Sequence, residues 1–259
     1  MKLYKAHAKV NIFLKITGKR DNYHEIFSRF MRVDNLYDML CFIPKEKENQ
    51  EFIILGDCGC ETTQNTIYKA FIALKDYTKS KSLEKLMLTH AIKVDKSIPS
   101  FAGLGGGSSD AATYIKMCNE VLHLGLSLNE LASIGVKVGA DVAFFIYGYN
   151  SANVSGIGEI VESFDEESLE FEIYTPDVMI STPKVYQTYR ESFYNPIDND
   201  KINIIKNKSS KEILESMTCQ ETNDLFSAAI QVYPELKKHY KLGYHFSGSG
   251  SSFFKIKGK

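Results

Sequence analysis

Hydrophobic and polar residues alternate along residues 6–16, which predicts a strand near the start of the chain. Its polar positions Lys9, Asn11 and Lys15 share one face of that strand. On charge pattern alone, such a face is typical of a strand surface exposed to solvent. Similar apolar patterns predict further strands at 38–43, 51–55, 91–94, 142–147, 156–161 and 169–174.

Helical spacing appears first between Ile115 and Leu122, where apolar residues recur until Gly125 ends the pattern. Ser127 at the N-cap and Glu130 three residues later form a capping box, which predicts that another helix begins there. Helices are also predicted to begin within 65–74, at 182–183 and at 223–225, whereas 192–211 is predicted to be a polar connection.

The order of these elements mixes strands and helices without strict alternation, which favours an α+β fold over a doubly wound sheet. An acidic stretch at 165–167 ends one run of alternation before the next begins, so it is the best candidate for a domain boundary. We therefore expect two domains, residues 1–163 and 164–259.

Composition narrows the class of protein. The chain has 259 residues, of which 44% are hydrophobic and 24% charged, as in an ordinary globular protein. A net charge of −1 gives no overall attraction to nucleic acid or to anionic membrane. Neither the first nine residues nor any later segment has the long apolar run of a signal peptide or membrane span. We expect a cytosolic protein that binds neither nucleic acid nor membrane.

The cysteines and histidines give no support to a metal site or a disulfide framework. The cysteines are odd in number and scattered, and we interpret them as free thiols: Cys41, Cys58, Cys60, Cys118 and Cys219. The pair at 58 and 60 is spaced too tightly for the usual zinc ligands, and no second pair accompanies it. The histidines lack His-x-x-x-His spacing.

The most informative stretch is 99–112, where four glycines fall within five positions between a predicted strand and a predicted helix. A glycine loop at a helix N-terminus directs free N–H groups and the positive end of the helix dipole at one point, which predicts an anion site. Ser108 follows Gly107 where a Walker A loop needs lysine, and the glycine spacing does not fit a dinucleotide fingerprint. The alternative is a flexible loop that binds nothing.

A candidate catalytic carboxylate follows the second of these helices. Asp141 lies in the turn Gly139-Ala140-Asp141, just before the apolar run at 142–147. A carboxylate there could act as a general base. Taken alone, an acidic residue at this position is more often only a turn or capping residue.

Three stretches together resemble one known family. Residues 99–112 are similar to the Pro-x3-Gly-Leu-Gly-Gly-Gly-Ser-Ser-Asp-Ala-Ala signature of the galactokinase, homoserine, mevalonate and phosphomevalonate (GHMP) kinase superfamily. Residues 247–251 resemble its third motif. Residues 8–11 and 20–24 resemble the branch that acts on a cytidine diphosphate-linked methylerythritol in the non-mevalonate isoprenoid pathway. The resemblance spans residues 1 to about 256.

This resemblance implies a fold and a nucleotide site. The expected architecture is a ribosomal-S5-domain-2-like N-terminal domain followed by a ferredoxin-like C-terminal domain. Lys96 and Asn65 would lie near the base or ribose of ATP. The residues expected to surround the ATP phosphates are Gly103, Leu104, Gly105, Gly106, Gly107, Ser108 and Ser109. Mg²⁺ is expected with ATP, and its ligands are left open, with the Ser109 hydroxyl as one candidate.

The resemblance also implies an acceptor site and a reaction. Asp141 would be the catalytic base and Lys9 its partner, for ATP-dependent phosphorylation of the 2-hydroxyl of the methylerythritol. Tyr186 would stack on the cytosine, and the other expected substrate contacts are Asn11, Tyr23, His24 and Thr182. A monomer or weak homodimer is expected. Two alternatives stay open: a GHMP kinase acting on mevalonate or homoserine, and a ligand sensor of the same fold without catalysis.

Overall fold

The computed structural model describes residues 1–47, 52–56 and 59–258, so Glu51 of a predicted strand and the thiol of Cys58 lie outside the described residues. The chain forms two compact units of mixed helix and sheet, as the α+β prediction requires. Unit 1 comprises residues 1–8, 34–100 and 106–148, and unit 2 comprises residues 9–33, 101–105 and 149–259. The long strands β1 (Tyr4–Arg20) and β2 (Tyr23–Pro44) contribute residues to both units.

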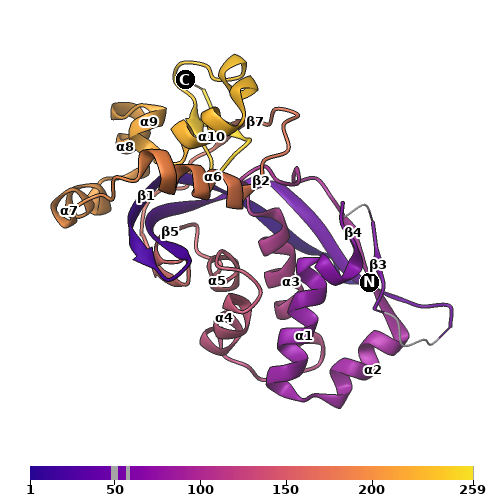
Figure 1. Cartoon of the computed structure of the whole chain (residues 1–259). Coiled ribbons are helices and arrows are strands. Elements are labelled where there is room, and N and C mark those ends of the chain that lie inside the picture. Colours follow the sequence, from indigo (N-terminus) through magenta and orange to yellow (C-terminus); the bar gives the residue numbers. More distant parts are fainter. Residues whose placement is uncertain (48–51, 57–58, 259) are drawn as a thin grey trace. The chain divides into compact units, whose positions relative to one another are not determined.

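In unit 1, the end of β2 pairs antiparallel with β4 (His90–Asp95), and β3 (Ile54–Leu55) pairs parallel with β4. Figure 1 shows helices α1 (Thr66–Thr78) and α3 (Gly106–Val121) side by side. These two helices bury small and aliphatic residues along their contact. The remaining helices of this unit are α2 (Lys81–Thr89), α4 (Leu128–Val136) and α5 (Val142–Tyr147).

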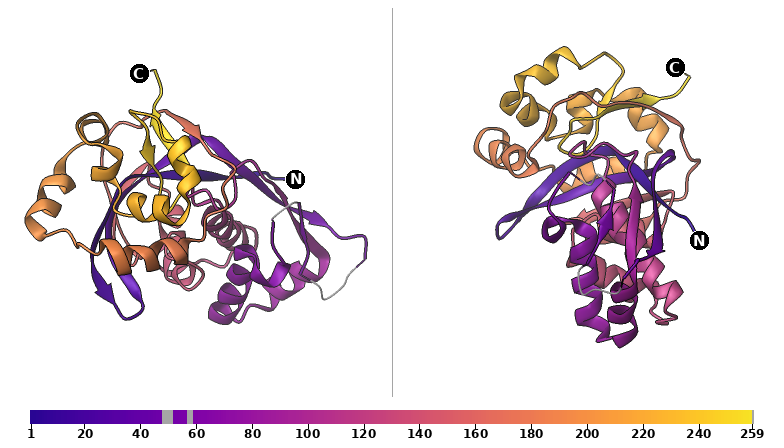
Figure 2. Two further views of the ribbon diagram at one scale, coloured as in Figure 1. Left: turned by 45° about the horizontal axis from the view of Figure 1, so that its top comes forward. Right: turned by 90° about the vertical axis from the view of Figure 1, so that its right-hand side faces the viewer.

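In unit 2, the first half of β2 pairs antiparallel with β5 (Ser151–Gly156), which pairs with β6 (Ile160–Ser163). A second sheet has the order β7 (Phe171–Tyr174), β9 (Phe253–Ile256) and β8 (His245–Phe246). Helices α6 (Thr182–Thr188) and α10 (Phe226–Val232) pack together, and their ribbons can be followed in Figure 2 in orange and gold. The other described helices are a π-helical turn (Tyr189–Phe193), α7 (Asn199–Asn207), α8 (Ser210–Ser216), α9 (Cys219–Thr222) and a 3-10 helix (Pro234–Lys238).

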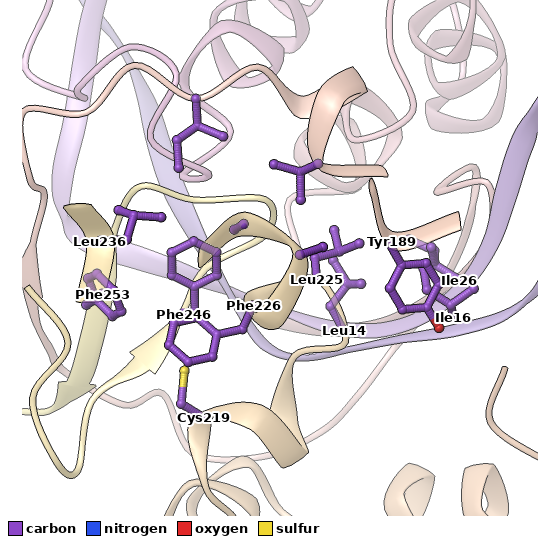
Figure 3. Close-up of a cluster of buried hydrophobic side chains, with 14 of the residues drawn as sticks. Leu14, Ile16, Ile26, Tyr189, Cys219, Leu225, Phe226, Leu236, Phe246 and Phe253 are labelled. Atoms are coloured by element: carbon purple, nitrogen blue, oxygen red, sulfur yellow. The ribbon is translucent and has the colours of Figure 1, made fainter. Parts of the chain in front are cut away.

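An aromatic and aliphatic cluster forms the core of unit 2 (Figure 3). The ring of Phe226 lies 5.2 Å from that of Phe246 and 6.1 Å from that of Phe253, measured between centroids. Leu14 and Ile16 of β1 are buried in the same cluster. The apolar face of β1 is therefore fixed by burial, which also determines the direction of its polar face.

The polar face of β1 is not exposed to solvent, contrary to the interpretation from charge pattern alone. Lys9 and Asn11 are buried, and the side chain of Lys15 is only 13% exposed, in an ion pair with Asp224. Burying such groups is tolerated because each finds a polar partner. The face is an internal polar surface, and this makes it a candidate for binding.

Several predicted elements are confirmed. The strands at 6–16, 38–43 and 91–94 lie within β1, β2 and β4, and the helix after the glycine loop is α3. Ser127 and Glu130 form the expected capping box at the start of α4. The thiols of Cys41, Cys60, Cys118 and Cys219 are free. Among the described residues, no helix is long and apolar enough to span a bilayer.

Three predicted elements are wrong. Residues 142–147 form the helix α5 because a short, fully buried apolar run carries no period that separates helix from strand. Gly148 ends that helix with φ of 71°. Residues 156–161 contain the turn between β5 and β6, where Gly156 also has positive φ. Residues 192–211 contain α7, which was predicted to be an irregular connection.

The position of α7 depends on Arg29, a side chain with no exposed surface. Its guanidinium donates at 2.6 Å to the backbone oxygens of Lys206 and Lys208, and at 3.0 Å to Oδ1 of Asn153. The guanidinium carbon also lies 3.4 Å from the ring centroid of Phe164. Burial lowers the pKa of Arg29 to about 10, so it remains charged at neutral pH. A cation at the carbonyl end of a helix is favourable.

Candidate active site

The first half of the glycine loop, residues 101–105, belongs to unit 2 and is built on positive backbone angles. Phe101, Gly103 and Gly105 have φ of 55°, 74° and 73°. A Cβ atom on Gly103 would lie 2.1 Å from the backbone oxygen of Ser247. No side chain fits there, so only glycine allows the C-terminal turn to approach this closely.

The C-terminal turn and the start of β1 hold this half of the loop by hydrogen bonds. Ser247 Oγ donates to the oxygen of Gly103 at 2.9 Å, and the backbone N–H of Ser252 donates to the oxygen of Ala102 at 3.1 Å. The backbone N–H of Lys9 donates to the oxygen of Leu104 at 2.9 Å. Parts of the three stretches that carried the family resemblance, residues 102–104, Lys9 and the turn at 247–252, therefore meet within unit 2.

The second half of the loop is the first turn of α3 in unit 1. Helices leave their first N–H groups without partners inside the helix, and these groups carry partial positive charge. Such groups, in a helix of 16 residues, suit an anion. The turn comprises Gly106, Gly107, Ser108 and Ser109, of which Ser109 is buried and Gly107 exposed.

The N-terminus of α1 is tied to this turn. Asn65 is the N-cap of α1, and its Oδ1 accepts from the N–H of Ile67 at 2.8 Å. The hydroxyl of the next residue, Thr66, donates to the backbone oxygen of Gly107 at 2.6 Å. Asn65 therefore lies at the edge of the predicted anion site. The contact of Thr66 was not predicted, and its position directly after a capping residue was the only signal.

Lys96 lies beside the same turn, held by two carboxylates. Its Nζ donates to Asp38 at 2.5 Å and to Asp110 at 2.8 Å, and lies 3.6 Å from where a Cβ of Gly106 would be. Asp38 also accepts from the N–H groups of Ser97 and Ile98.

In the network of Lys96, Asp38 and Asp110, burial opposes the charged forms while attraction between opposite charges favours them. Burial raises the pKa of Asp110 to about 7, despite the nearby ammonium group. Burial opposes the charge of Lys96, but the carboxylates of Asp110 and Asp38 outweigh it and raise the pKa of Lys96. Asp110 Oδ1 is buried without a hydrogen-bond partner among the described residues. The family resemblance nominated Lys96 for the region of the base or ribose of ATP, which stays a prediction, and the sequence gave no sign of its two carboxylate partners.

Asp141 also lies in unit 1, in the turn before α5. A Cβ atom on Gly139 would lie 3.8 Å from Ser108 Oγ, so this turn lies beside the first turn of α3. Asp141 stands at the N-cap of α5, but its side chain makes no capping hydrogen bond. Capping therefore does not account for an acidic residue at this position.

Lys9 and Asn11 lie in unit 2 on the internal polar face of β1. Lys9 Nζ donates to Asn11 Oδ1 at 2.5 Å and lies 4.5 Å from the ring centroid of Phe30. Asn11 is 2% exposed, and its backbone N–H donates to Ser247 Oγ at 3.3 Å. Thus the lysine and asparagine predicted for the site lie close together beside the C-terminal turn. Lys9 and Asp141 belong to different units.

An aromatic cluster surrounds His24 at the start of β2. Its ring centroid lies 5.3 Å from that of Tyr186, 5.9 Å from that of Tyr189 and 6.4 Å from that of Tyr194. His24 Nε2 is buried without a hydrogen-bond partner among the described residues. Burial, followed by the charges of Arg190 and Lys19, lowers the pKa of His24. The imidazole is therefore neutral at pH 7.

The other predicted acceptor residues occupy different surroundings. The hydroxyl of Thr182, at the start of α6, lies 2.6 Å from that of Ser249 in the C-terminal turn. Tyr23 is 64% exposed, and within the part of the chain that the structure describes no ring contact places it in the His24 cluster. Tyr194 was missed because it follows a π-helical turn inside a stretch that the sequence predicted to be irregular. Nothing in its neighbours marked it.

The two sets of residues differ in what they can bind. Around the first turn of α3, unit 1 gathers backbone N–H groups, the Asn65 cap, Lys96 and the turn of Asp141, which suits a polyphosphate next to a carboxylate. In unit 2, a cluster of tilted and T-shaped aromatic rings and a buried neutral imidazole suit a flat polar base.

Comparison with known proteins matches this chain to one family model and to relatives that share one name. The family described as GHMP kinases N terminal domain matches residues 65–149. A 4-diphosphocytidyl-2-C-methyl-D-erythritol kinase from Sulfurimonas denitrificans is 64% identical, covering 100% of this chain and 98% of the relative. One from a Sulfurovum species is 46% identical, covering 97% and 98%.

Solved structures agree. A crystal structure of 4-(cytidine 5'-diphospho)-2C-methyl-D-erythritol kinase has a TM-score of 0.71 at 26% identity, covering 98% of this chain and 90% of that one. A mevalonate kinase has a TM-score of 0.63 at 16% identity, covering 99% and 91%, which shows the fold alone. With its glycine loop, its C-terminal turn and full-length identity of 64%, the chain belongs to the 4-diphosphocytidyl-2-C-methyl-D-erythritol kinase family of GHMP kinases.

Proposed function

We propose that this kinase transfers the γ-phosphoryl group of ATP to the 2-hydroxyl of 4-diphosphocytidyl-2-C-methyl-D-erythritol. The observation that carries the proposal is that the turn containing Asp141 lies beside the first turn of α3, so an acidic residue belongs to a segment that borders the anion site. Full-length identity to relatives of that name supports the choice of acceptor.

The glycine loop is the proposed binding site for the ATP phosphates. Gly103, Leu104 and Gly105 shape the chain before the helix, and the N–H groups of residues 106–109 bind the phosphate oxygens. Asn65 and Lys96 border this turn and would contact the rest of the nucleotide. Phosphoryl transfer depends mainly on positioning and charge stabilisation, and oriented N–H groups provide both.

Asp141 is the proposed general base and Lys9 its cationic partner. A carboxylate that accepts the proton of the attacking hydroxyl contributes about 10²- to 10⁴-fold to the rate. The ammonium of Lys9 would favour the ionised form of that carboxylate and stabilise developing negative charge. Burial of Lys9 strengthens this effect because water screens the charge less.

The aromatic cluster is the proposed binding site for the cytosine. Tyr186 offers a half-buried ring for stacking, and the unpartnered His24 Nε2 would gain a polar atom of the base as its partner. Asn11, Tyr23 and Thr182 would contact the remainder of the acceptor. Of these three, Asn11 is best fixed, since it is buried and hydrogen-bonded.

We propose that Mg²⁺ binds together with ATP. Mg²⁺ commonly uses one or two protein oxygens together with phosphate oxygens and water. Among the described residues, no three acidic, histidine or cysteine side chains gather into a metal site of their own. The hydroxyl oxygen of Ser109, in the first turn of α3, is a candidate ligand for an ion that needs so few protein oxygens. Bound there, the ion would neutralise phosphate charge.

The finer architecture is part of the same proposal. Residues 1–163 would form the ribosomal-S5-domain-2-like domain and residues 164–259 the ferredoxin-like domain. The three-stranded sheet of β7, β9 and β8, packed with α6 and α10, supports the second assignment. We further propose that the enzyme works in the cytosol as a monomer or weak homodimer.

An assay of ADP release tests the proposed function directly. Turnover is compared with diphosphocytidyl-methylerythritol, mevalonate and homoserine as acceptors at equal ATP. We expect turnover with the first alone. Turnover with mevalonate or homoserine instead would show a different acceptor, and turnover with none would favour a ligand sensor of the same fold.

A further inference from the structure

A buried serine on β2 connects to the proposed catalytic lysine through one asparagine. Ser28 has no exposed surface, and its hydroxyl donates to the backbone oxygen of Phe13. The hydroxyl oxygen of Ser28, Oγ, accepts a hydrogen bond from Asn11 Nδ2 at 3.0 Å. Asn11 Oδ1 in turn accepts from Lys9 Nζ at 2.5 Å. All of these residues belong to unit 2.

Donor and acceptor chemistry allows these hydrogen bonds, from Lys9 through Asn11 and Ser28 to Phe13, to run in one direction only. A serine hydroxyl carries a single hydrogen, and here it is committed to a backbone oxygen, which can only accept. Ser28 Oγ can therefore only accept from Asn11, so the amide must present Nδ2 to the serine and Oδ1 to the lysine. The reversed amide would direct an NH₂ group at an ammonium group, with donors facing each other and no acceptor between them.

We propose that Ser28 is a positioning residue for phosphoryl transfer. It fixes the orientation of the Asn11 amide, and through that amide it holds the ammonium group of Lys9 in place. Without the serine hydroxyl, the Asn11 amide loses one of the two partners that fix its orientation, so it holds the Lys9 ammonium less firmly. The inference rests on the role proposed above for Lys9, and it adds a residue that neither glycine motif contains.

The test measures steady-state kinetics of the full chain with Ser28→Ala and Ser28→Thr. We expect Ser28→Ala to lower kcat by roughly 10-fold, because displaced catalytic groups lose rate, while KM for ATP changes less than about twofold. Threonine keeps the hydroxyl, so Ser28→Thr should recover most of the loss. Ser28→Cys, which fills the space but forms only weak hydrogen bonds, should resemble alanine. It also serves if the alanine variant does not fold.

Ser210→Ala is the matched control. Ser210 is another serine of unit 2 with no exposed surface, and its hydroxyl donates to Glu166 at 2.6 Å. Its loss should lower thermal stability comparably while leaving kcat unchanged. If Ser210→Ala and Ser28→Ala reduce kcat equally, or if Ser28→Thr fails to recover it, the role of Ser28 is purely structural and the inference is overturned.

Lys9→Ala separates this inference from the proposed function. If Lys9→Ala loses most of its kcat while Ser28→Ala and Ser28→Cys keep wild-type kcat, the inference about Ser28 fails and the role of Lys9 stands. If Lys9→Ala itself keeps wild-type kcat, the proposed catalytic role of Lys9 fails, and the inference fails with it.

Discussion

The anion site at the first turn of α3 and the aromatic cluster around His24 are built in opposite ways. The anion site is made of backbone groups from consecutive residues, 106–109, supported by Thr66 and Lys96. The cluster is made of side chains from the start of β2, from α6 and from the segment that includes the π-helical turn.

This difference determines which substitutions each region tolerates. A backbone site is insensitive to most side-chain chemistry but fails where a Cβ atom meets another backbone segment, as at Gly103 in the adjoining half of the loop. A side-chain cluster tolerates changes that keep shape and fails when a ring is lost. Nucleotide binding and acceptor binding should therefore respond to different kinds of variant.

The largest expected effect is on chemistry rather than on either binding region. Asp141→Asn should lower kcat by roughly 100-fold or more, because the amide cannot accept the proton of the hydroxyl. Affinity for ATP, measured by calorimetry, should stay near wild type. Turnover close to wild type would remove Asp141 from the role of base.

The half of the glycine loop that adjoins the anion site is tested by adding one methyl group. Gly103→Ala should lower the free energy of unfolding by about 2–3 kcal/mol, because its Cβ overlaps the oxygen of Ser247. The control Gly125→Ala has similar φ, 71°, but nothing within 4 Å, so it should cost about 1 kcal/mol. Urea denaturation compares them. Equal losses would show that backbone angle alone matters at Gly103.

The aromatic cluster is tested by removing one ring. Tyr186→Ala should raise KM for the cytidine-bearing acceptor by an amount equivalent to about 1–3 kcal/mol of lost stacking, with KM for ATP unchanged. Tyr186→Phe keeps the ring and should retain a KM near wild type. An unchanged KM in the alanine variant would place the cytosine elsewhere.

The smallest expected effect is a change in how stability depends on pH. Burial lowers the pKa of His24, so below the unfolded value of about 6.5 the unfolded chain gains a proton that the folded chain resists. Stability from this residue is complete above that pH and is lost as pH falls. Between pH 7.5 and 5.5, the free energy of unfolding measured by denaturation should therefore fall less steeply in His24→Gln than in the wild type. Identical slopes would contradict burial of a neutral imidazole.

Local features were predictable from sequence, whereas side-chain assemblies were not. The glycine loop, the capping box at Ser127 and the start of α1 follow from the chemistry of adjacent residues, which a sequence displays directly. The roles of Lys9 and Asp141 came from family resemblance, and they stay predictions. Burial of Arg29 and Asp38 had no sequence signal, because their partners lie far along the chain.

The same distinction explains the wrong elements. Residues 142–147 form a helix whose buried surroundings, rather than any period, select its structure. In α7, helical propensity is modest, and the carbonyl groups at its end are satisfied by Arg29 from another part of unit 2. Tertiary partners decide both cases.

The bond from Ser247 to Gly103 joins residues 144 positions apart, and it has a consequence for the order in which the protein is made. A growing chain presents the first half of the glycine loop before residues 247–252 are synthesised, so that half waits for partners that lie far along the chain. An interrupted or truncated product would carry the complete ATP signature yet lack its fixed geometry. The geometry of this half of the loop therefore depends on synthesis of the turn at 247–252.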